Sequence, residues 1–233
     1  MEKLSEENKH GQTLGYSVKN WHSKELPHHK NMNGKYCILE PLEINRHGKD
    51  LFDAFQLDDK GEDWTYLPYG PFDDYTDFEK YLSDGITKRI CFAIINPVTQ
   101  LPVGISTYHD IDVTHGVIEV GGLIFSRKLQ KTIAATEAMY LMMKHVFDDL
   151  HYRRYQWRCN ALNKGSRASA LRLGFQFEGI FRHAHVFKGY NRDTAWFSIL
   201  DNEWPALKLK FEEWLDENNF DAQGNQIKRL QDC

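Results

Sequence analysis

Residues 125–138 carry a pattern suited to holding an anion. They join a strand with adjacent glycines, Gly121 and Gly122, to a strongly helical stretch. The first N–H groups of a helix have no partner within it, so they and the helix dipole favour an anion such as a pyrophosphate at this turn. The small side chains of Ala134 and Ala135 would let phosphates come close. The alternative is an ordinary strand-to-helix turn with alanine packing, and the chain has neither a GxGxxG nor a P-loop pattern.

A second candidate lies between Cys159 and Phe175. Asn163 is a suitable N-cap and Gly174 a suitable C-cap for a short helix in this run. Ser166 would then be the third helical residue, with its hydroxyl at the positive end of the helix, where it could face a developing thiolate or oxyanion. In the alternative interpretation, Ser166 only caps its own helix.

These two segments belong to an alternation of strands and helices. Apolar periodicity, caps and turn residues predict the order βααβββαβαββα. The expected strands are 36–42, 90–95, 102–108, 117–125, 155–159, 175–182 and 194–200, and the expected helices follow Asn45 and Asp73 or Asp74 and cover 131–150, 163–173 and 205–218. Glycine inside the strand 117–125 indicates a bulge or a close backbone approach. Without a repeat or a linker, the chain is expected to form one mixed α/β domain.

Composition limits the class of protein. The chain has 233 residues, of which 41% are hydrophobic and 27% charged, so it can bury a core. Its formal net charge of -4 opposes binding of nucleic acid or an anionic membrane by bulk charge. The four cysteines form no CxxC pair, the first residues have no apolar signal segment, and no apolar run approaches the ~18 residues of a membrane span. We therefore expect a soluble cytoplasmic protein with no nucleic-acid and no membrane partner.

Taken together, these segments resemble the GNAT acetyltransferase superfamily, and in particular its RimJ/RimL type. The similarity covers roughly residues 36–205 and rests on AATEA, on NxxSxxxxxxLGFxxEG and on RDTAWFSILDNEWP. It implies a single domain with a central mixed, mostly antiparallel sheet flanked by helices. It further implies transfer of an acetyl group from acetyl-CoA to an amine by direct attack, in a cleft where two parallel central strands part.

The resemblance also implies roles for individual residues. Residues 118–122 would offer backbone groups to the pantetheine and one N–H to the thioester oxygen, and Asn163 would hydrogen-bond the pantetheine arm. Ser166 could protonate the leaving thiolate, and residues 130–135 would form the pyrophosphate loop. Where the family pattern Q/R-x-x-G-x-G/A has its first glycine, this chain has Ile133, which predicts a less close approach of the phosphates. The implied cofactor-binding residues are Val120, Gly121, Gln130, Lys131, Thr132, Ile133, Ala134, Ala135 and Asn163.

The acceptor amine must lose a proton before it can attack. An alkyl amine with a pKa of ~10 is mostly protonated at neutral pH, and a carboxylate or an imidazole could take the proton directly or through water. Glu119, on the glycine-containing strand beside the implied thioester position, is the candidate catalytic base. The alternative is a solvent-facing glutamate on an alternating strand.

Two further groups are candidate contacts for the acceptor. His183 and His185 stand at i and i+2 and would share a strand face. Without a third ligand at a recognisable spacing they do not predict a metal site, so a substrate contact is favoured. Trp64, Tyr66 and Tyr69 lie in a loop that looks like the variable acceptor wall of the family. The alternative for this loop is a lid that packs on the core.

The sequence thus predicts an acetyl-CoA-dependent N-acetyltransferase without a metal, acting on a primary amine of a small molecule or on a protein N-terminus. A catalytically silent module that binds or senses acyl-CoA is the alternative, and Ile133 is the feature that favours it. Residues 1–34 are expected to form an arm, 35–204 the acyltransferase domain, and 205–233 a C-terminal helix and tail. The slightly acidic composition favours a small or amphipathic amine over a strongly anionic one.

Overall fold

The computed structural model describes residues 5–233 as strands, helices and connecting turns. The strands are β1 (Ser5–Glu7), β2 (Thr13–Gly15), β3 (Met32–Asn33), β4 (Ile38–Pro41), β5 (Ile90–Ile95), β6 (Pro102–Asp112), β7 (Val117–Phe125), β8 (Arg154–Asn160), β9 (Gln176–Phe187) and β10 (Tyr190–Leu200). The α-helices are α1 (Ile44–Phe55), α2 (Tyr75–Ile86), α3 (Ile133–Lys144), α4 (Lys164–Arg172) and α5 (Trp204–Leu215). From β4 onward, the order of strands and α-helices is the predicted one.

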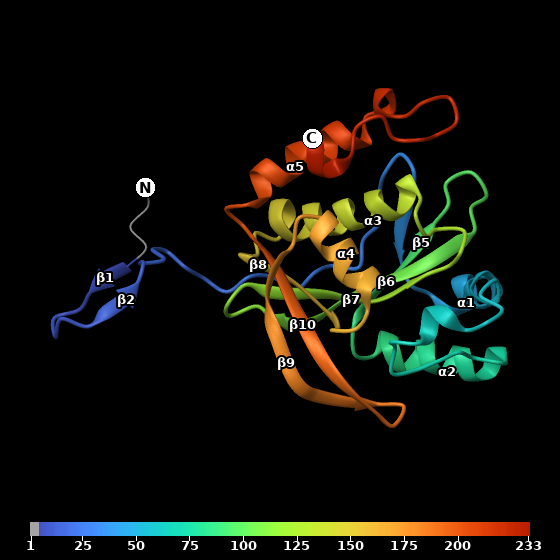
Figure 1. Ribbon diagram of the computed structural model, residues 1–233, viewed down its shortest axis with the longest axis horizontal. Coiled ribbons are helices and arrows are strands. Elements are labelled where there is room, and N and C mark those ends of the chain that lie inside the picture. The colour runs from blue at the N-terminus through green and yellow to red at the C-terminus, as the bar shows by residue number, and fades with distance from the viewer. Residues whose placement is uncertain (1–4) are drawn as a thin grey trace.

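Eight strands form one sheet in the order β3-β4-β5-β6-β7-β8-β10-β9 (Figure 1). Every neighbouring pair is antiparallel except β7 and β8, which are parallel and joined through α3. This confirms the prediction of a mixed α/β domain with a mostly antiparallel sheet. No helix in residues 5–233 combines the length and the apolarity required to cross a membrane.

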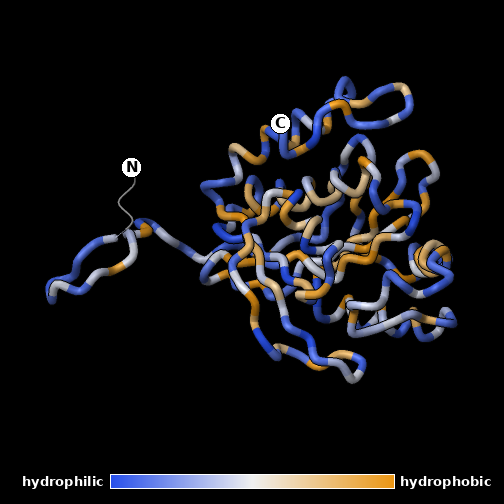
Figure 2. The backbone as a smooth tube through the Cα atoms, viewed as in Figure 1, coloured by the Kyte–Doolittle hydropathy of each residue, from blue (hydrophilic) through white to orange (hydrophobic). Residues whose placement is uncertain are grey.

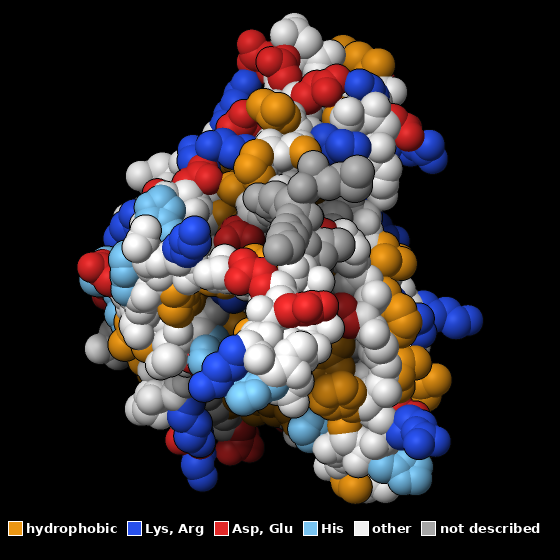
Figure 3. Space-filling model, turned by 90° about the vertical axis from the view of Figure 1, so that its left-hand side faces the viewer, with side chains coloured by type: hydrophobic (Ala, Val, Ile, Leu, Met, Phe, Trp, Pro, Cys, Tyr) orange, Lys and Arg blue, Asp and Glu red, His pale blue; other side chains and the backbone are white. Residues whose placement is uncertain are grey.

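Two hydrophobic clusters lie on opposite faces of the sheet. The larger includes Met142 of α3 and Tyr155 of β8, and α5 packs on the outer side of α3 (Figure 1). The smaller includes Leu51 of α1 and Phe78 of α2, which cover the half of the sheet formed by the earlier strands. Hydrophobic residues gather along the sheet and α3, whereas the β1–β2 hairpin is largely hydrophilic (Figure 2). The face drawn in Figure 3 carries charged side chains of both signs, interspersed.

The start of α1 differs from the prediction. Glu43, not Asn45, is the N-cap residue, and Asn45 lies in the first turn of the helix. The helix begins earlier because the His47 N–H donates to the Glu43 carbonyl at 2.8 Å, and the buried His47 ring accepts from the Glu43 N–H through Nδ1 at 3.1 Å. Asp74 is the cap of α2, as one of the two predicted candidates, and accepts from the Asp77 N–H at 3.0 Å.

Helix α3 is shorter than the predicted 131–150. Lys131 has a φ of 60°, in the left-handed region, so it cannot belong to the helix. Thr132 is the N-cap, and its Oγ1 accepts from the Ala135 N–H at 3.2 Å. After Lys144 the chain continues in a π-helical turn, residues 145–149.

The β9–β10 hairpin is longer than the predicted strands 175–182 and 194–200. The two strands continue to a turn at Lys188 and Gly189, both of which have positive φ, as tight hairpin turns require. A register shift between Arg192 and Thr194 interrupts the hairpin, and residues around this bulge do not alternate like a regular strand. The hairpin therefore extends well beyond the segment that the sequence pattern identifies.

The segment before β4 partly joins the domain. The β1–β2 hairpin projects from the rest of the chain (Figure 1), whereas β3 pairs with β4 at the sheet edge. Between them, the Trp21 indole N–H donates to the Thr114 carbonyl, and the Tyr152 hydroxyl donates to the Glu25 carbonyl. At the other end, the residues after α5 fold back, with the Trp214 indole N–H donating to Gln226 Oε1 at 2.9 Å.

Glu137 fixes the start of the sheet to α3. Its side chain is buried, and its two carboxylate oxygens accept hydrogen bonds from the N–H groups of Lys35, Tyr36 and Cys37 at 2.6–2.8 Å. A Cβ on Gly34 would collide with the same carboxylate, so glycine is required for this close approach. One carboxylate thus satisfies three backbone donors that precede β4.

Replacing Glu137 with alanine should lower the free energy of unfolding by roughly 3 kcal/mol or more, because one hydrogen bond to a charged group contributes about 1.5–3 kcal/mol and three are lost. Urea denaturation measures the change. Glu6→Ala in the exposed β1–β2 hairpin is the control and should leave the midpoint unchanged. Equal midpoints for Glu137→Ala and the control would show that the carboxylate does not anchor the sheet.

Candidate active site

Strands β7 and β8 part in the middle of the sheet. Their parallel pairing runs from Val117–Arg154 to Val120–Trp157 and ends there, although β7 continues to Phe125 and β8 to Asn160. Helix α3 follows the carboxyl end of β7, and α4 follows that of β8. The N-termini of both helices, with their free N–H groups and positive dipole ends, therefore lie at the end where the strands diverge.

The glycines of β7 mark the position of this divergence. The register against β6 shifts between Ile105 and Thr107, and Gly122 has a φ of 55°, so the predicted bulge is confirmed. Gly121 is the first residue after the last β8 pair, and a Cβ there would collide with Nε2 of His109. The Thr107 hydroxyl donates to the Gly121 carbonyl at 2.8 Å. Only glycine allows the imidazole to lie directly against this part of the backbone.

The loop before α3 contains the predicted anion-binding residues. Thr132 caps the helix, which leaves the N–H groups of Ile133 and Ala134 without an intrahelical partner. Ile133, Ala134 and Ala135 are partly buried and pack against the larger core cluster. The Gln130 side chain instead donates to the Phe125 carbonyl and to Asp63 Oδ2, both at 2.8 Å, so it fixes the loop.

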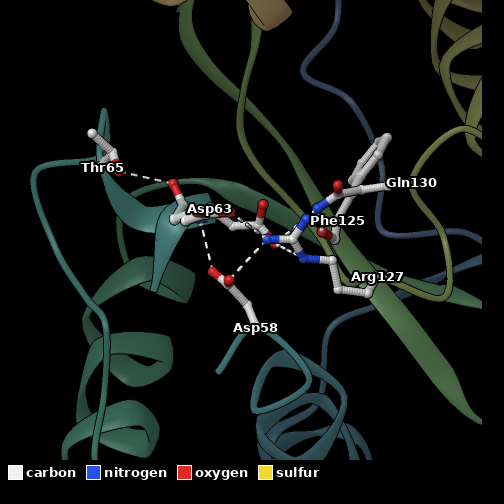
Figure 4. Close-up of polar contacts among 7 residues, drawn as sticks. Asp58, Asp63, Thr65, Phe125, Arg127 and Gln130 are labelled. Atoms are coloured by element: carbon white, nitrogen blue, oxygen red, sulfur yellow. Dashed lines mark hydrogen bonds and ion pairs between the residues drawn. The ribbon is translucent and has the colours of Figure 1, made fainter. Parts of the chain in front are cut away.

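An ion-pair network joins this loop to the segment between α1 and α2 (Figure 4). Arg127 contacts Asp58 at 2.8 Å, Asp63 at 3.2 Å and Glu62 at 3.5 Å. The Asp58 side chain is buried in spite of its charge. With Gln130 also bound to Asp63, the candidate cofactor loop and the loop that leads to the aromatic residues are held as one unit.

The N-terminus of α4 is built as predicted. Asn163 is the N-cap, and its Oδ1 accepts from the Ser166 N–H at 2.9 Å. Ser166 Oγ accepts from the Trp157 indole N–H at 3.0 Å, at the last residue where β8 pairs with β7. The Ser166 hydroxyl is thus not the cap of its own helix, and its own proton is not used in the bond with Trp157.

Glu119 is buried, with 1% of its surface exposed, so the solvent-facing alternative is wrong. Its Oε1 lies 3.0 Å from Arg158 Nε and 3.4 Å from His109 Nε2, and its Oε2 has no hydrogen-bond partner in the described part of the chain. Burial raises the pKa of Glu119 to about 8, against the opposing charge of Arg158. A carboxyl group with this pKa can exchange a proton near neutral pH.

Sequence reasoning missed His109, Asp110 and Arg158. His109 lies one residue beyond the predicted strand 102–108, and the register places it directly opposite Glu119. Burial lowers the pKa of His109 to about 4, so the imidazole is neutral. Ligand atoms of His109, Asp110 and Glu119 lie within 4.8 Å of one another, but Arg158 contacts both carboxylates, and its positive charge opposes a metal cation there.

His183 and His185 both line an open hollow on the sheet. His183 has a φ of 52° at the β9 bulge, and its N–H donates to Asp193 Oδ1 at 2.8 Å. The His185 ring stacks on Phe187 with the centroids 5.3 Å apart. In residues 5–233, neither imidazole makes a hydrogen bond or an ion pair with Glu119, His109 or Arg158.

The aromatic loop divides between packing and exposure. The Trp64 side chain is 4% exposed and belongs to the smaller core cluster, where it meets Phe72 edge to face at 5.4 Å. The Tyr69 and Tyr81 rings are tilted by 37° with their centroids 4.3 Å apart, and Tyr66 is exposed. The Trp64 carbonyl accepts from Lys188 Nζ at 2.9 Å, which ties the tip of the β9–β10 hairpin to this loop. Trp64 therefore supports the loop from within the core, and Tyr66 and Tyr69 remain candidates for the acceptor wall.

Comparison with known proteins agrees with this geometry. Residues 37–176 match the family described as "Acetyltransferase (GNAT) domain". A GCN5-related N-acetyltransferase from Brucella melitensis is 42% identical, with a TM-score of 0.90 over 92% of this chain and 98% of that one. A probable GNAT-family acetyltransferase from Chromobacterium violaceum is 38% identical, with a TM-score of 0.78 over 82% of this chain and 96% of that one.

The chain belongs to the GNAT acetyltransferase family, as the resemblance predicted, and is an acyltransferase. Enzymes of this family use acetyl-CoA. A curated relative from Bacillus subtilis, named "Putative ribosomal N-acetyltransferase YdaF", is 27% identical over 105 residues. That alignment spans 45% of this chain and 57% of the relative, so only about half of each protein is compared.

Replacing Ser166 with alanine should lower kcat by roughly 100-fold, at the low end of general-acid contributions, with little change in the Kd for acetyl-CoA. Steady-state kinetics and calorimetric titration measure the two effects. Ser169→Ala, in the same helix, is the control and should behave like the wild type. An unchanged kcat in Ser166→Ala would leave the hydroxyl only as the acceptor for Trp157.

Replacing Ile133 with glycine should not strengthen the binding of coenzyme A, because the side chain packs against the core. The variant should instead lose about 1 kcal/mol or more of stability from helix propensity and lost packing. Ile133→Ala removes most of the side chain without adding the backbone freedom of glycine, so it separates these two effects. Tighter binding in both variants would mean that the isoleucine obstructs the phosphates.

Proposed function

We propose that this protein transfers the acetyl group of acetyl-CoA to a primary amine by direct attack, without a covalent enzyme intermediate. The observation that carries the proposal is the buried Glu119, with its raised pKa, beside the point where β7 and β8 part. The acceptor is a small-molecule amine or a protein N-terminus, and the curated relative is named a putative ribosomal N-acetyltransferase. A cytoplasmic location and the division at residues 34 and 204 stay predictions of the sequence.

The residues at the divergence fit acetyl-CoA. The N–H groups of Ile133 and Ala134, at the positive end of α3, are suited to the pyrophosphate. The backbone of Val120 and Gly121 borders the gap in which the pantetheine arm would lie, and the Asn163 side-chain NH₂ is available because only its oxygen caps α4. When bound, acetyl-CoA supplies an activated acyl thioester.

Glu119 is the proposed base. Its carboxylate form takes a proton from the acceptor nitrogen, directly or through water. The neutral His109 has a ring nitrogen 3.4 Å from Glu119 Oε1, and the same nitrogen lies against the Gly121 backbone. The imidazole can therefore hydrogen-bond the acceptor or a water that passes the proton to the carboxylate.

Ser166 is the proposed acid. Its Oγ accepts from the Trp157 N–H, so the hydroxyl is oriented with its own proton directed elsewhere. The positive end of α4 favours negative charge next to this hydroxyl. The leaving sulfur can take its proton here.

A silent acyl-CoA-binding module is less well supported than an enzyme. Ile133 is the feature that favours the silent module. Its side chain, however, packs against the core, so the Ile133 N–H at the start of α3 is still available to a phosphate. A binding module would also have no use for a buried carboxylic acid with a pKa of about 8 beside a neutral imidazole. Acetylation of any amine eliminates the silent module, and binding of acetyl-CoA without transfer to any amine favours it.

The pH dependence of kcat tests the role of Glu119. Because burial raises its pKa, the protonated form dominates below about pH 8, and the base form grows as the pH rises through that value. We expect kcat at saturating acceptor to rise with an apparent pKa of about 8 in the wild type. In Glu119→Gln, kcat should fall by roughly 100-fold or more and lose this rise.

The measurement uses saturating acceptor because kcat then does not depend on the ionisation of the free acceptor in solution. Glu178→Gln, a carboxylate of β9 that pairs with Arg154, is the control and should keep the wild-type profile. If Glu119→Gln kept the same rise in kcat near pH 8, another group would be the base.

A further inference from the structure

The open hollow next to Glu119 has a volume of about 870 Å³. It lies on the sheet face opposite α3, because Trp157 and Ala195, the neighbours of Arg158 and Trp196 in their strands, are buried in the core on the α3 side. Arg158 connects the hollow to the base, since its Nε contacts Glu119 at 3.0 Å. The residues that line the hollow include Arg158, Arg182, His183, His185, Phe181 and Trp196.

The lining is cationic and aromatic, and within the described chain no acidic side chain lines it. Three carboxylates near the lining are already engaged, and one of them is Glu119, which lies 3.0 Å from Arg158 Nε. Asp110 contacts Arg158 Nη2, and Asp193 accepts from the His183 N–H and from Asn191. The charge of Arg158 is thus shared with two carboxyl groups, whereas Arg182 and Arg192 have no ion pair in residues 5–233 and supply the positive charge that a ligand would meet.

Three polar groups of β10 are buried without partners in or beside this hollow: Trp196 lines it, and the register places Arg192 opposite His185 and Thr194 opposite Phe181. They are Arg192 Nε, Thr194 Oγ1 and Trp196 Nε1, and in residues 5–233 none of these atoms has a hydrogen bond. Thr194 is 1% exposed. Buried donors without partners are costly and rare in native proteins, so these groups point to a ligand that accepts hydrogen bonds.

The arginines also act on the histidine of the hollow. Burial, and then the charges of Arg192 and Arg158, lower the pKa of His185, so that imidazole is neutral at neutral pH. The Arg192 guanidinium lies 4.6 Å from the centroid of the Phe187 ring, and this contact holds the guanidinium near the end of β9. His185 therefore adds no positive charge for a ligand.

We propose that the acceptor amine carries a carboxylate, which binds in this hollow to Arg158 and the Trp196 indole N–H and, at its edge, to Arg192, which the strand register places opposite His185. Guanidinium groups match the planar geometry of a carboxylate. Phe181 and Trp196, whose ring centroids are 5.3 Å apart, offer an apolar surface for the side chain of the acceptor. The acceptor class is thus an amine with one carboxylate and an apolar side chain, as in an aromatic or aliphatic amino acid.

A single negative charge fits better than a phosphate. Arg158 already shares Nε and Nη2 with Glu119 and Asp110, which leaves Nη1 for a ligand. A dianion would lie next to two carboxyl groups and would be repelled by Asp110. The composition of the chain favours a small or amphipathic amine, and an amino acid with an apolar side chain is such an amine. The local anion site accounts for its carboxylate.

The inference rests on the proposed acetyl transfer, in which the acceptor nitrogen forms a C–N bond as the thioester C–S bond breaks. Glu119 takes one proton of the ammonium form before attack, the sulfur receives the Ser166 proton, and the second proton of the nitrogen passes, directly or through water, to the Ser166 oxygen. With the carboxylate on Arg158, which also contacts Glu119, the amino group next to the carboxylate is held close to the base. The hollow therefore both selects the acceptor and orients its nitrogen.

Matched acceptor pairs that differ only in the carboxylate test the proposal. The pairs are phenylalanine with phenethylamine, tryptophan with tryptamine, and leucine with isopentylamine. We expect kcat/KM to be at least ~10-fold higher for the amino acid in one or more pairs. Arg192→Gln and Trp196→Phe should bring this ratio close to one, whereas Arg154→Gln, an arginine paired with Glu178, should keep it.

Binding of the acetylated products separates the two proposals. N-Acetylphenylalanine should raise the melting temperature more than N-acetylphenethylamine, whether or not turnover occurs. Preferential binding without turnover of any amine would retain the anion site and overturn acetyl transfer. Equal or better turnover of the plain amines would overturn the carboxylate site. A preference for phosphoethanolamine over ethanolamine, with no preference for the amino acids over their plain amines, would also overturn it.

Discussion

The pairing between β7 and β8 ends at Val120 and Trp157, and the position of every proposed functional group depends on where it ends. Both strands continue beyond that point because each has a second neighbour, β6 for β7 and β10 for β8. The sheet can therefore open in its middle without losing either strand. Because the two strands are parallel, the helices that follow them begin at the same end, and their N-termini border the opening.

The same opening lets a carboxyl group be buried close to the place of reaction. Glu119 lies one residue before the last β7–β8 pair, opposite His109 and in contact with Arg158. Its burial costs the charged form free energy, and this raises the pKa to about 8. A stretch of sheet built for stability alone would place an apolar residue there. The buried carboxyl, the neutral imidazole and the unpartnered donors of β10 together form a polar face that is suited to an acceptor.

Local patterns in the sequence predicted much of the scaffold and part of the site. The caps Asn163 and Asp74, the bulge at Gly122 and the order of elements from β4 onward follow from residue types and short-range spacing. The part that could not be predicted depends on pairing between distant strands. His109 lies one residue beyond the strand that the sequence predicts. The sequence pattern gives Arg158 and Arg192 no function, and only the register shows that they lie beside Glu119 and the hollow. The pattern of an aromatic loop does not show which rings are exposed, so it predicts Trp64 in the acceptor wall, whereas the Trp64 side chain lies in the core.

Hydrogen–deuterium exchange with and without acetyl-CoA, followed by mass spectrometry, tests the central claim most directly. If acetyl-CoA binds where β7 and β8 part, it should slow exchange in residues 118–135 and in residues 163–167. The first range covers the end of the β7–β8 pairing, the free half of β7 and the start of α3, and the second covers the start of α4. Exchange in α1 and in the β1–β2 hairpin should stay unchanged. No protection in residues 118–135, or protection confined to β9 and β10, would contradict the account.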